Sequence, residues 1–169
     1  SLQAMLIIQE GKIIFANRKG GSGKTSLVVN LAYNLARRRK KVLVVDLDSQ
    51  AHSSFYLSKD FQDTPQCLYH YFKDQFDLSK LIQKTAYRNL SLLPSSPKMA
   101  ELNELIRERV PFLDEGLSEL KNSYDFILFD LPPSIEKIVL AGLVASEEVI
   151  IPLQTHFFPM QGIAQLVQL

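Results

Sequence analysis

One glycine-rich stretch limits what this chain can fold into more than any other feature. Residues 18–26 read Arg-Lys-Gly-Gly-Ser-Gly-Lys-Thr-Ser. Glycines leave the backbone bare, so that its N–H groups can close around the oxygen atoms of a phosphate. The glycines of this stretch are Gly20, Gly21 and Gly23. The stretch therefore predicts a phosphate-binding loop rather than a flexible turn.

The side chains around these glycines have the chemistry that such a loop needs. Lys24 is expected to neutralise the β and γ phosphates of a nucleotide, and the Thr25 hydroxyl is expected to bind Mg²⁺. A standard loop has a further glycine at the position of Arg18, and this chain has a second lysine, Lys19, next to it. The residues expected to bind the nucleotide are Lys19, Gly20, Gly21, Ser22, Gly23, Lys24, Thr25 and Ser26.

The segments on either side of the loop have the patterns of a strand and a helix. Residues 12–16 form a short apolar run of β type that ends where the loop begins. After the loop, leucines recur every four residues, beside a row of smaller apolar residues, which is typical of a helix. These leucines are Leu27, Leu31 and Leu35. This order places the amino end of the helix, with its unpaired N–H groups and partial positive charge, against the phosphates.

Strand-like and helical patterns alternate along the whole chain, which predicts an α/β fold with a parallel sheet between two layers of helices. Strands are expected near residues 12–17, 42–47, 90–93, 125–130 and 147–152, with a short hairpin strand at Met5–Ile8. Helices are expected near 24–39, 67–83, 97–109, 112–122, 135–145 and 159–169. Residues 1–169 are expected to form a single domain, because no repeat, low-complexity tract or linker divides them.

Carboxylates follow two of the predicted strands at the points where the strands end. Asp46 and Asp48 end the second strand, and Asp130 ends the run Phe126–Phe129. Ligands in open α/β sheets lie at the carboxyl ends of strands, so one pocket can collect these side chains and the loop. Asp130 can hold Mg²⁺ through water, across from Thr25. For Asp130, the alternative is a carboxylate that caps the following Pro-Pro turn. For Asp46 and Asp48, the alternative is a pair of solvated loop carboxylates.

The composition sets limits on the class of protein. Hydrophobic residues make up 46% of the 169 residues and charged residues 22%, which is ordinary for a soluble globular protein. A single cysteine, Cys67, excludes an internal disulfide and suits the cytoplasm. The longest apolar stretch, near residues 138–145, is far too short to span a membrane. No signal peptide is recognisable at the amino end.

A run of basic residues, Arg37–Lys41, ends the first predicted helix. Two interpretations stay open. Basic residues suit the negative end of a helix dipole, and they also suit contact with DNA or anionic lipid. With a net charge of +1, any such contact has to come from a local patch. The three histidines, His52, His70 and His156, lack metal-ligand spacing and are expected to be structural.

The loop resembles the deviant Walker A motif, K-G-G-x-G-K-[ST], of the ParA/MinD family of ATPases. Three further segments agree with this resemblance. Residues 42–50 are similar to the D-L-D-P-Q segment of the partition branch, with Ser49 in place of proline. Residues 124–134 resemble the Walker B strand and the D-x-P-P that follows it, and residues 149–154 resemble the next strand.

The resemblance implies roles for individual residues. Asp48 is expected to orient the attacking water, and Asp46 to support the Mg²⁺ shell. Lys19 is expected to reach across a nucleotide-dependent homodimer to the ATP of the partner subunit, although an exposed lysine is the plain alternative. With Lys24, these residues form the expected catalytic set of Lys19, Lys24 and Asp48, and the expected metal set is Thr25, Asp46 and Asp130.

The resemblance also implies a function. It favours a P-loop ATPase that binds ATP and Mg²⁺ and hydrolyses ATP slowly, as a dimerisation switch in chromosome or plasmid partitioning. The expected partners are a centromere-binding ParB-like protein and nonspecific DNA rather than a membrane, in the cytoplasm or on the nucleoid. The alternatives are a MinD-like membrane-associated positioning ATPase and a noncatalytic P-loop interaction module. Family members continue well beyond the position of Leu169, so the carboxyl-terminal part of the family fold is expected to be missing here.

Overall fold

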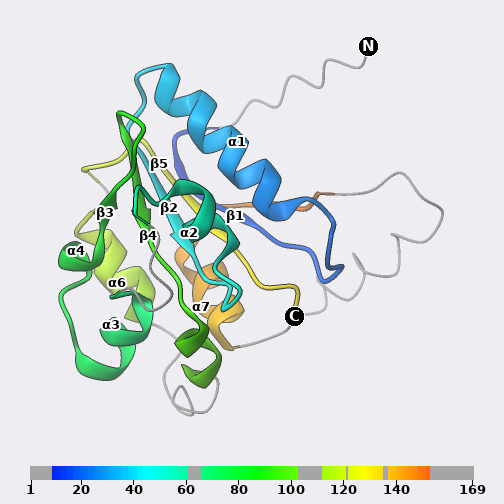
Figure 1. Cartoon of the computed structure of the whole chain (residues 1–169), viewed down its shortest axis with the longest axis vertical. Coiled ribbons are helices and arrows are strands. Elements are labelled where there is room, and N and C mark those ends of the chain that lie inside the picture. Colours follow the sequence, from blue (N-terminus) through cyan, green and yellow to red (C-terminus); the bar gives the residue numbers. More distant parts are fainter. Residues whose placement is uncertain (1–8, 61–65, 103–111, 121, 135–136, 153–169) are drawn as a thin grey trace.

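The computed structural model describes residues 9–60, 66–102, 112–120, 122–134 and 137–152. In this part of the chain a sheet of six strands has the order β3-β4-β2-β5-β1-β6 (Figure 1). The strands are β1 (Gly11–Phe15), β2 (Val42–Asp46), β3 (Gln83–Lys84), β4 (Leu90–Leu93), β5 (Phe126–Asp130) and β6 (Glu148–Ile150). All neighbouring strands are parallel except β3, which pairs antiparallel with β4 at the edge.

The register of the central strands brings the expected site together. β5 lies between β1 and β2, and Asp130 is opposite Phe15 on one side and Asp46 on the other. The two carboxylates and the start of the glycine-rich loop therefore lie at the same edge of the sheet. This edge is the carboxyl edge, where parallel strands of this fold class hold their ligands.

Helices cover both faces of the sheet, as the alternating patterns predict. They are α1 (Lys24–Arg37), α2 (His52–Leu57), α3 (Leu68–Asp74), α4 (Leu78–Leu81), α6 (Phe112–Ser118) and α7 (Lys137–Ala145), with a 3-10 helix, η1, at Pro97–Glu101. Successive strand residues point to opposite faces. Ile13 and Phe15 pack in the core beneath α1 and α2, whereas Ile14 packs in the core beneath α3, α4, α6 and α7.

Helix α1 lies against the sheet through its small residues. Val28, Ala32 and Ala36 are buried at intervals of four, while Leu27 is 40% exposed. Leu31 and Leu35 are partly buried and pack against the same core, so the row of leucines that predicts the helix lies beside the fully buried row. Small side chains allow the helix backbone to lie close to the strands, and α1 carries the loop at its amino end.

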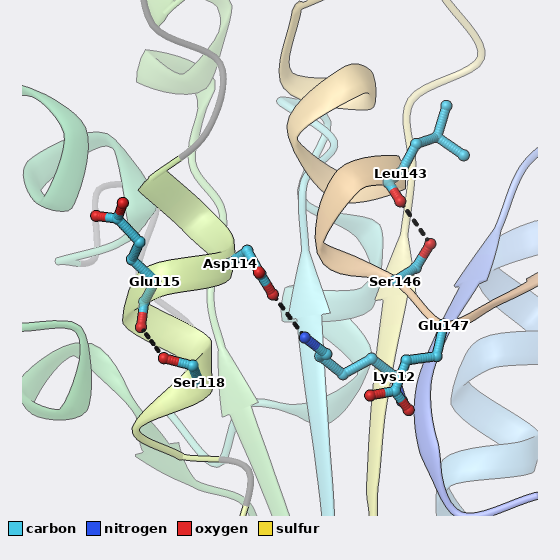
Figure 2. A network of polar contacts seen from close by, with 7 residues as sticks. All are labelled: Lys12, Asp114, Glu115, Ser118, Leu143, Ser146 and Glu147. Atoms are coloured by element: carbon cyan, nitrogen blue, oxygen red, sulfur yellow. Dashed lines mark hydrogen bonds and ion pairs between the residues drawn. The ribbon is translucent and has the colours of Figure 1, made fainter.

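A polar contact ties the amino end of β1 to α6 on the second face. The Nζ atom of Lys12 lies 2.6 Å from Oδ1 of Asp114, and this contact is a dashed line in Figure 2. Glu147, which precedes β6, is bonded to the backbone of the same lysine: its N–H donates to the Lys12 carbonyl at 2.7 Å. The side chain of Lys12 is 11% exposed and that of Asp114 is 46% exposed.

Several expected elements differ from the structure. The predicted helix over residues 67–83 is wrong as one element, because Gln75 adopts a left-handed backbone with φ of 53° and Asp77 caps a new helix by accepting from Ser79. Of the helix predicted over 97–109, residues 97–101 form a 3-10 helix that begins at Pro97, and residues 103–109 lie outside the described residues. The sheet is not wholly parallel, because the two-residue strand β3 pairs antiparallel with β4. This strand was not expected. Helix α2 was not expected either.

Other expectations hold with shifted bounds or cannot be compared. The five predicted strands are confirmed within one or two residues at each end. The predicted helix 24–39 ends at Arg37, and the helix predicted over 112–122 ends at Ser118. The expected strand at Met5–Ile8 and the expected helix over 159–169 lie outside the described residues, as does His156.

Candidate functional site

The glycine-rich loop has a backbone that only glycine adopts easily. Gly21 has φ of 70° and Gly23 has φ of 87°, both in the left-handed region. An added Cβ at either position meets no atom within 4 Å, so the backbone conformation, and not crowding, calls for glycine. Gly23 is also the N-cap of α1, and its carbonyl accepts the first helical hydrogen bond, from Leu27 N, at 2.9 Å.

The loop closes around a pocket of about 380 Å³. This volume lies within the range of small-molecule sites. Every residue from Gly20 to Ser26 lines the pocket, and the other lining residues are Asp48, Gln50, His52 and Pro133. Seven of the eight expected nucleotide-binding residues thus meet in one cavity. Lys19 is exposed outside this lining, and its N–H donates to Oδ1 of Asn17 at 2.9 Å.

Lys24 is buried at the base of the loop, with 7% of its surface exposed. Its Nζ donates to the carbonyl of Asn17 at 2.9 Å. Burial lowers the pKa of Lys24, and the nearby carboxylates of Asp130 and Asp48 oppose that shift. Lys24 also lines the pocket, so its expected role as the cation that neutralises phosphate stays a prediction that this placement suits.

Asp130 is 1% exposed at the end of β5. Its Oδ2 accepts a hydrogen bond from the Ser53 hydroxyl at 2.7 Å, whereas its Oδ1 is buried without a hydrogen-bond partner among the described residues. Burial raises the pKa of Asp130, and the hydroxyls of Ser53 and Thr25 act in the opposite direction. A carboxylate oxygen without a protein partner, next to a threonine hydroxyl, fits a cation that binds oxygen ligands.

Asp46 lies directly beside Asp130 and is fully buried, and neither carboxylate is among the described residues that line the pocket. Its Oδ2 accepts from the backbone N–H and the hydroxyl of Ser54 at 2.8 and 2.7 Å, and its Oδ1 accepts from Asp48 N at 3.1 Å. Burial, with the neighbouring Asp130, raises the pKa of Asp46 to about 8. Both of its oxygens already have protein partners, so its expected place in the Mg²⁺ shell stays a prediction.

Asp48 diverges from Asp46, because the chain turns after β2. Asp48 is half-buried, lines the pocket and accepts from Gln50 N at 2.9 Å. Its carbonyl accepts from the hydroxyl of Ser95, and Ser95 N donates to the hydroxyl of Ser54, at 2.6 and 2.8 Å. Asp48 is thus held over the loop by a polar network that joins β2, α2 and the end of β4.

Sequence reasoning missed the serines of this network and the extra lining residues. Ser53 and Ser54 follow the aspartates by only a few positions, in a segment of small polar residues without helical period. The proximity of two serines to D-L-D-S-Q was the available signal. His52, which was expected to be structural, is exposed and lines the pocket. The described residues contain no group of three or more His, Cys, Asp or Glu side chains that could hold a metal ion.

No helix in the described part of the chain is long and apolar enough to cross a membrane.

Comparisons with known proteins identify the family. Residues 11–169 match the family model described as AAA domain. The chain is 37% identical to the sporulation initiation inhibitor protein Soj of Bacillus subtilis over 162 residues, which covers 93% of this chain and 64% of that protein. It is also 37% identical to the chromosome-partitioning ATPase Soj of Treponema pallidum, covering 92% of this chain and 62% of that protein. The chain thus spans a little under two thirds of the length of these relatives.

Solved structures confirm the fold. A plasmid partition protein from Borrelia burgdorferi matches with a TM-score of 0.83 and 26% identity, covering 95% of this chain and 72% of that one. A cobyrinic acid a,c-diamide synthase from Mycobacterium smegmatis, with bound ADP and magnesium, matches with a TM-score of 0.86 and 29% identity, covering 95% of this chain and 66% of that one. The chain therefore belongs to the AAA domain family and, within it, to the Soj-like ParA branch of the ParA/MinD ATPases.

Proposed function

We propose that this chain binds ATP with Mg²⁺ and hydrolyses the ATP slowly, as a dimerisation switch in chromosome or plasmid partitioning. The observation that carries the proposal is the pocket in which the glycine-rich loop, the Lys24 ammonium and the Asp48 carboxylate meet. Phosphoryl transfer needs positioned charges more than covalent chemistry, so this small set is sufficient. The partitioning role is supported by the names of the Soj and ParA relatives.

Different groups of the protein bind the phosphates and the cation. The backbone N–H groups of residues 20–25 and the Lys24 ammonium bind the β and γ phosphates. Mg²⁺, when bound, would neutralise negative charge that develops on the phosphate oxygens. The Thr25 hydroxyl and the unpartnered Oδ1 of Asp130 are the groups that would hold it.

Hydrolysis and dimerisation depend on residues at the rim. Asp48 accepts a proton or hydrogen bond from the attacking water, because its carboxylate lies at the pocket. Lys19 belongs to the site of the partner subunit, where it supplies a cation that stabilises the transferring phosphate. Its exposed place outside the lining of its own pocket supports this role. A ParB-like protein and nonspecific DNA are the proposed partners of the ATP-bound homodimer.

Nucleotide titration and light scattering test the proposal together. Lys24→Ala is expected to weaken ATP binding in calorimetry, whereas Lys80→Ala, which removes an exposed lysine on α4, leaves it unchanged. Asp48→Ala is expected to bind ATP, stop hydrolysing it and accumulate as a dimer. Lys19→Ala is expected to bind ATP as a monomer. Equal ATP affinity of wild type and Lys24→Ala contradicts the nucleotide site, and a normal ATP-dependent dimer of Lys19→Ala contradicts the trans contact.

A further inference from the structure

A second concave site lies at the far end of α1 from the nucleotide pocket. Helix α1 has 14 residues, so its ends are about 20 Å apart. The turn before β4 lies beside the carboxyl end of this helix (Figure 1), and the side chain of Asn89 donates to the carbonyl of Ala36 at 3.4 Å. Between them is a groove of about 720 Å³. This arginine groove is lined by Tyr33, Ala36, Arg37, Arg39, Ala86, Tyr87, Arg88 and Asn89.

The groove gathers positive charge from two elements. Arg37 and Arg39 come from the end of α1 and Arg88 from the turn, and all three are exposed. No acidic side chain is among the described lining residues. Neither of the two ion pairs found in the described residues involves these arginines, since they join Lys12 to Asp114 and Lys40 to Glu10. Like charges that converge without a counter-charge attract an anion.

The backbone on both sides of the groove is held in place. Arg39 has a left-handed backbone with φ of 65°, and its N–H donates to the carbonyl of Ala36 at 3.0 Å. In the turn, the Thr85 hydroxyl accepts from Tyr87 N at 3.0 Å and donates to the carbonyl of Leu90 at 2.9 Å. The groove is therefore a formed feature of the fold rather than a gap between loose segments.

Aromatic rings complete the lining. Tyr33 and Tyr87 meet edge to face with centroids 5.0 Å apart, and the Arg37 guanidinium lies 5.8 Å from the centre of the Tyr33 ring. Stacking of this kind pre-positions a guanidinium, whose planar fork matches phosphate oxygens in pairs. The phenol hydroxyls offer additional donors. Arginine and tyrosine together are the side chains that track a nucleic-acid strand.

We propose that the arginine groove binds the phosphodiester backbone of nucleic acid. A concave groove of this size accepts a polymer backbone, but a flat bilayer surface does not enter it. Insertion into a membrane surface also requires apolar side chains beside the charges. The exposed large apolar side chains of the described residues, apart from the two groove tyrosines, lie elsewhere, for example Phe55 and Tyr56 on α2. The basic run at the end of α1 thus has a ligand as well as a favourable place on the helix dipole.

This inference rests on the proposed function, in which DNA is a partner. It adds that DNA binds in the arginine groove, away from the nucleotide pocket. Binding of a labelled mixed-sequence duplex and of its single strand is measured by fluorescence anisotropy across a range of salt concentrations. Each arginine that pairs with a phosphate adds about one to the steepness of the salt dependence. Arg37→Gln with Arg88→Gln is therefore expected to lower the slope by about two and to weaken binding at least about tenfold.

Three controls make the result decisive. Lys80→Gln removes one charge on the opposite face of the sheet and is expected to leave oligonucleotide binding unchanged. Arg37→Lys with Arg88→Lys keeps the charge and is expected to keep most of the salt slope. ATP binding by the double glutamine variant is measured in the same preparation. A double glutamine variant that binds ATP normally but has lost oligonucleotide binding supports the groove as the binding site. A wild-type protein that does not bind ATP contradicts the proposed function instead.

Two outcomes overturn the inference. One is equal affinity and equal salt slope for the wild type and the double glutamine variant. The other is wild-type binding to phosphatidylserine vesicles without binding to either oligonucleotide. The two oligonucleotides separate the sources of the phosphodiester chemistry. Tighter binding of the single strand, reduced by Tyr87→Leu, indicates stacking on the ring, whereas tighter binding of the duplex without that effect indicates backbone contacts alone.

Discussion

The hydroxyl of Ser53 donates a 2.7 Å hydrogen bond to Oδ2 of Asp130, across the boundary between α2 and the end of β5. This bond fixes the orientation of the carboxylate, so that one oxygen is occupied and Oδ1 remains without a partner in the described residues. A residue that orients a metal ligand affects metal affinity without touching the metal. For the Mg²⁺ site proposed at Asp130, Ser53 is therefore a candidate positioning residue, and it is not among the described residues that line the pocket.

Ser53→Ala is expected to raise the Mg²⁺ concentration needed for half-maximal ATP binding by about tenfold, because Asp130 loses its fixed orientation. The measurement is a Mg²⁺ titration of fluorescent ATP-analogue binding. Ser118→Ala, which removes an exposed serine hydroxyl that bonds the Glu115 carbonyl on α6, serves as the matched control. An unchanged Mg²⁺ requirement in Ser53→Ala contradicts the positioning role.

The buried carboxylates make stability depend on pH. The pKa of Asp46 is raised from 3.8 to about 8 on folding, so between these values the folded chain binds a proton that the unfolded chain has released. The free energy of unfolding then falls as pH rises through this window, by up to about 1.4 kcal/mol per pH unit. Asp130, whose pKa is also raised, acts in the same direction.

Asp46→Asn is expected to flatten this dependence between about pH 5 and pH 8. Asparagine keeps an acceptor oxygen for Ser54 and carries no charge at any pH. Urea unfolding at several pH values measures the effect, with the exposed Asp74→Asn on α3 as the control. The same slope in wild type and Asp46→Asn means that another group titrates on folding.

Two neighbouring glycines of the loop allow a test of whether its left-handed backbone requires glycine. Gly21 has a left-handed backbone and Gly20 does not, while an added Cβ meets nothing within 4 Å at either position. Gly21→Ala is therefore expected to lower the free energy of unfolding without ligand by about 1–2 kcal/mol, and Gly20→Ala to change it by less than about 0.5 kcal/mol. Thermal or urea unfolding of the two variants compares them. Equal effects mean that the loop relaxes to another backbone.

The sequence predicted the parts of the site that have a strong local signature. The loop between a strand and a helix, and the aspartates at the ends of apolar runs, place Lys24, Asp48 and Asp130 in one region without any structural information. Parallel strands end at a common edge, and this physical rule makes the prediction possible.

Other parts depend on contacts between distant segments. Ser53 and Ser54 acquire their roles from Asp130 and Asp46, and nothing in the pattern of residues 51–57 indicates a helix. The break between α3 and α4 depends on a left-handed backbone at Gln75. Glutamine is not among the residue types that favour this conformation, so the sequence does not indicate the break. The arginine groove joins Arg37 to Arg88, 51 positions apart, and only the fold brings them together.

The ion pair between Lys12 and Asp114 allows a test of how α6 is fixed to the sheet (Figure 2). Lys12 is the more buried partner, so removal of Asp114 leaves an ammonium with little access to water. Removal of Lys12 leaves a carboxylate that remains 46% exposed and is hydrated. The two truncations are therefore expected to have unequal effects, although the pair itself contributes little because one side is open to solvent.

Asp114→Ala is expected to lower the free energy of unfolding by about 1–2 kcal/mol, whereas Lys12→Met, which replaces the buried chain by an apolar one of similar length, changes it by less than about 1 kcal/mol. The double variant Lys12→Met with Asp114→Ala is expected to be more stable than Asp114→Ala alone, since no unpaired charge remains buried. Urea unfolding of the four proteins gives the comparison. A double variant less stable than Asp114→Ala means that the ammonium reaches water without Asp114, and that α6 is held to β1 by packing alone.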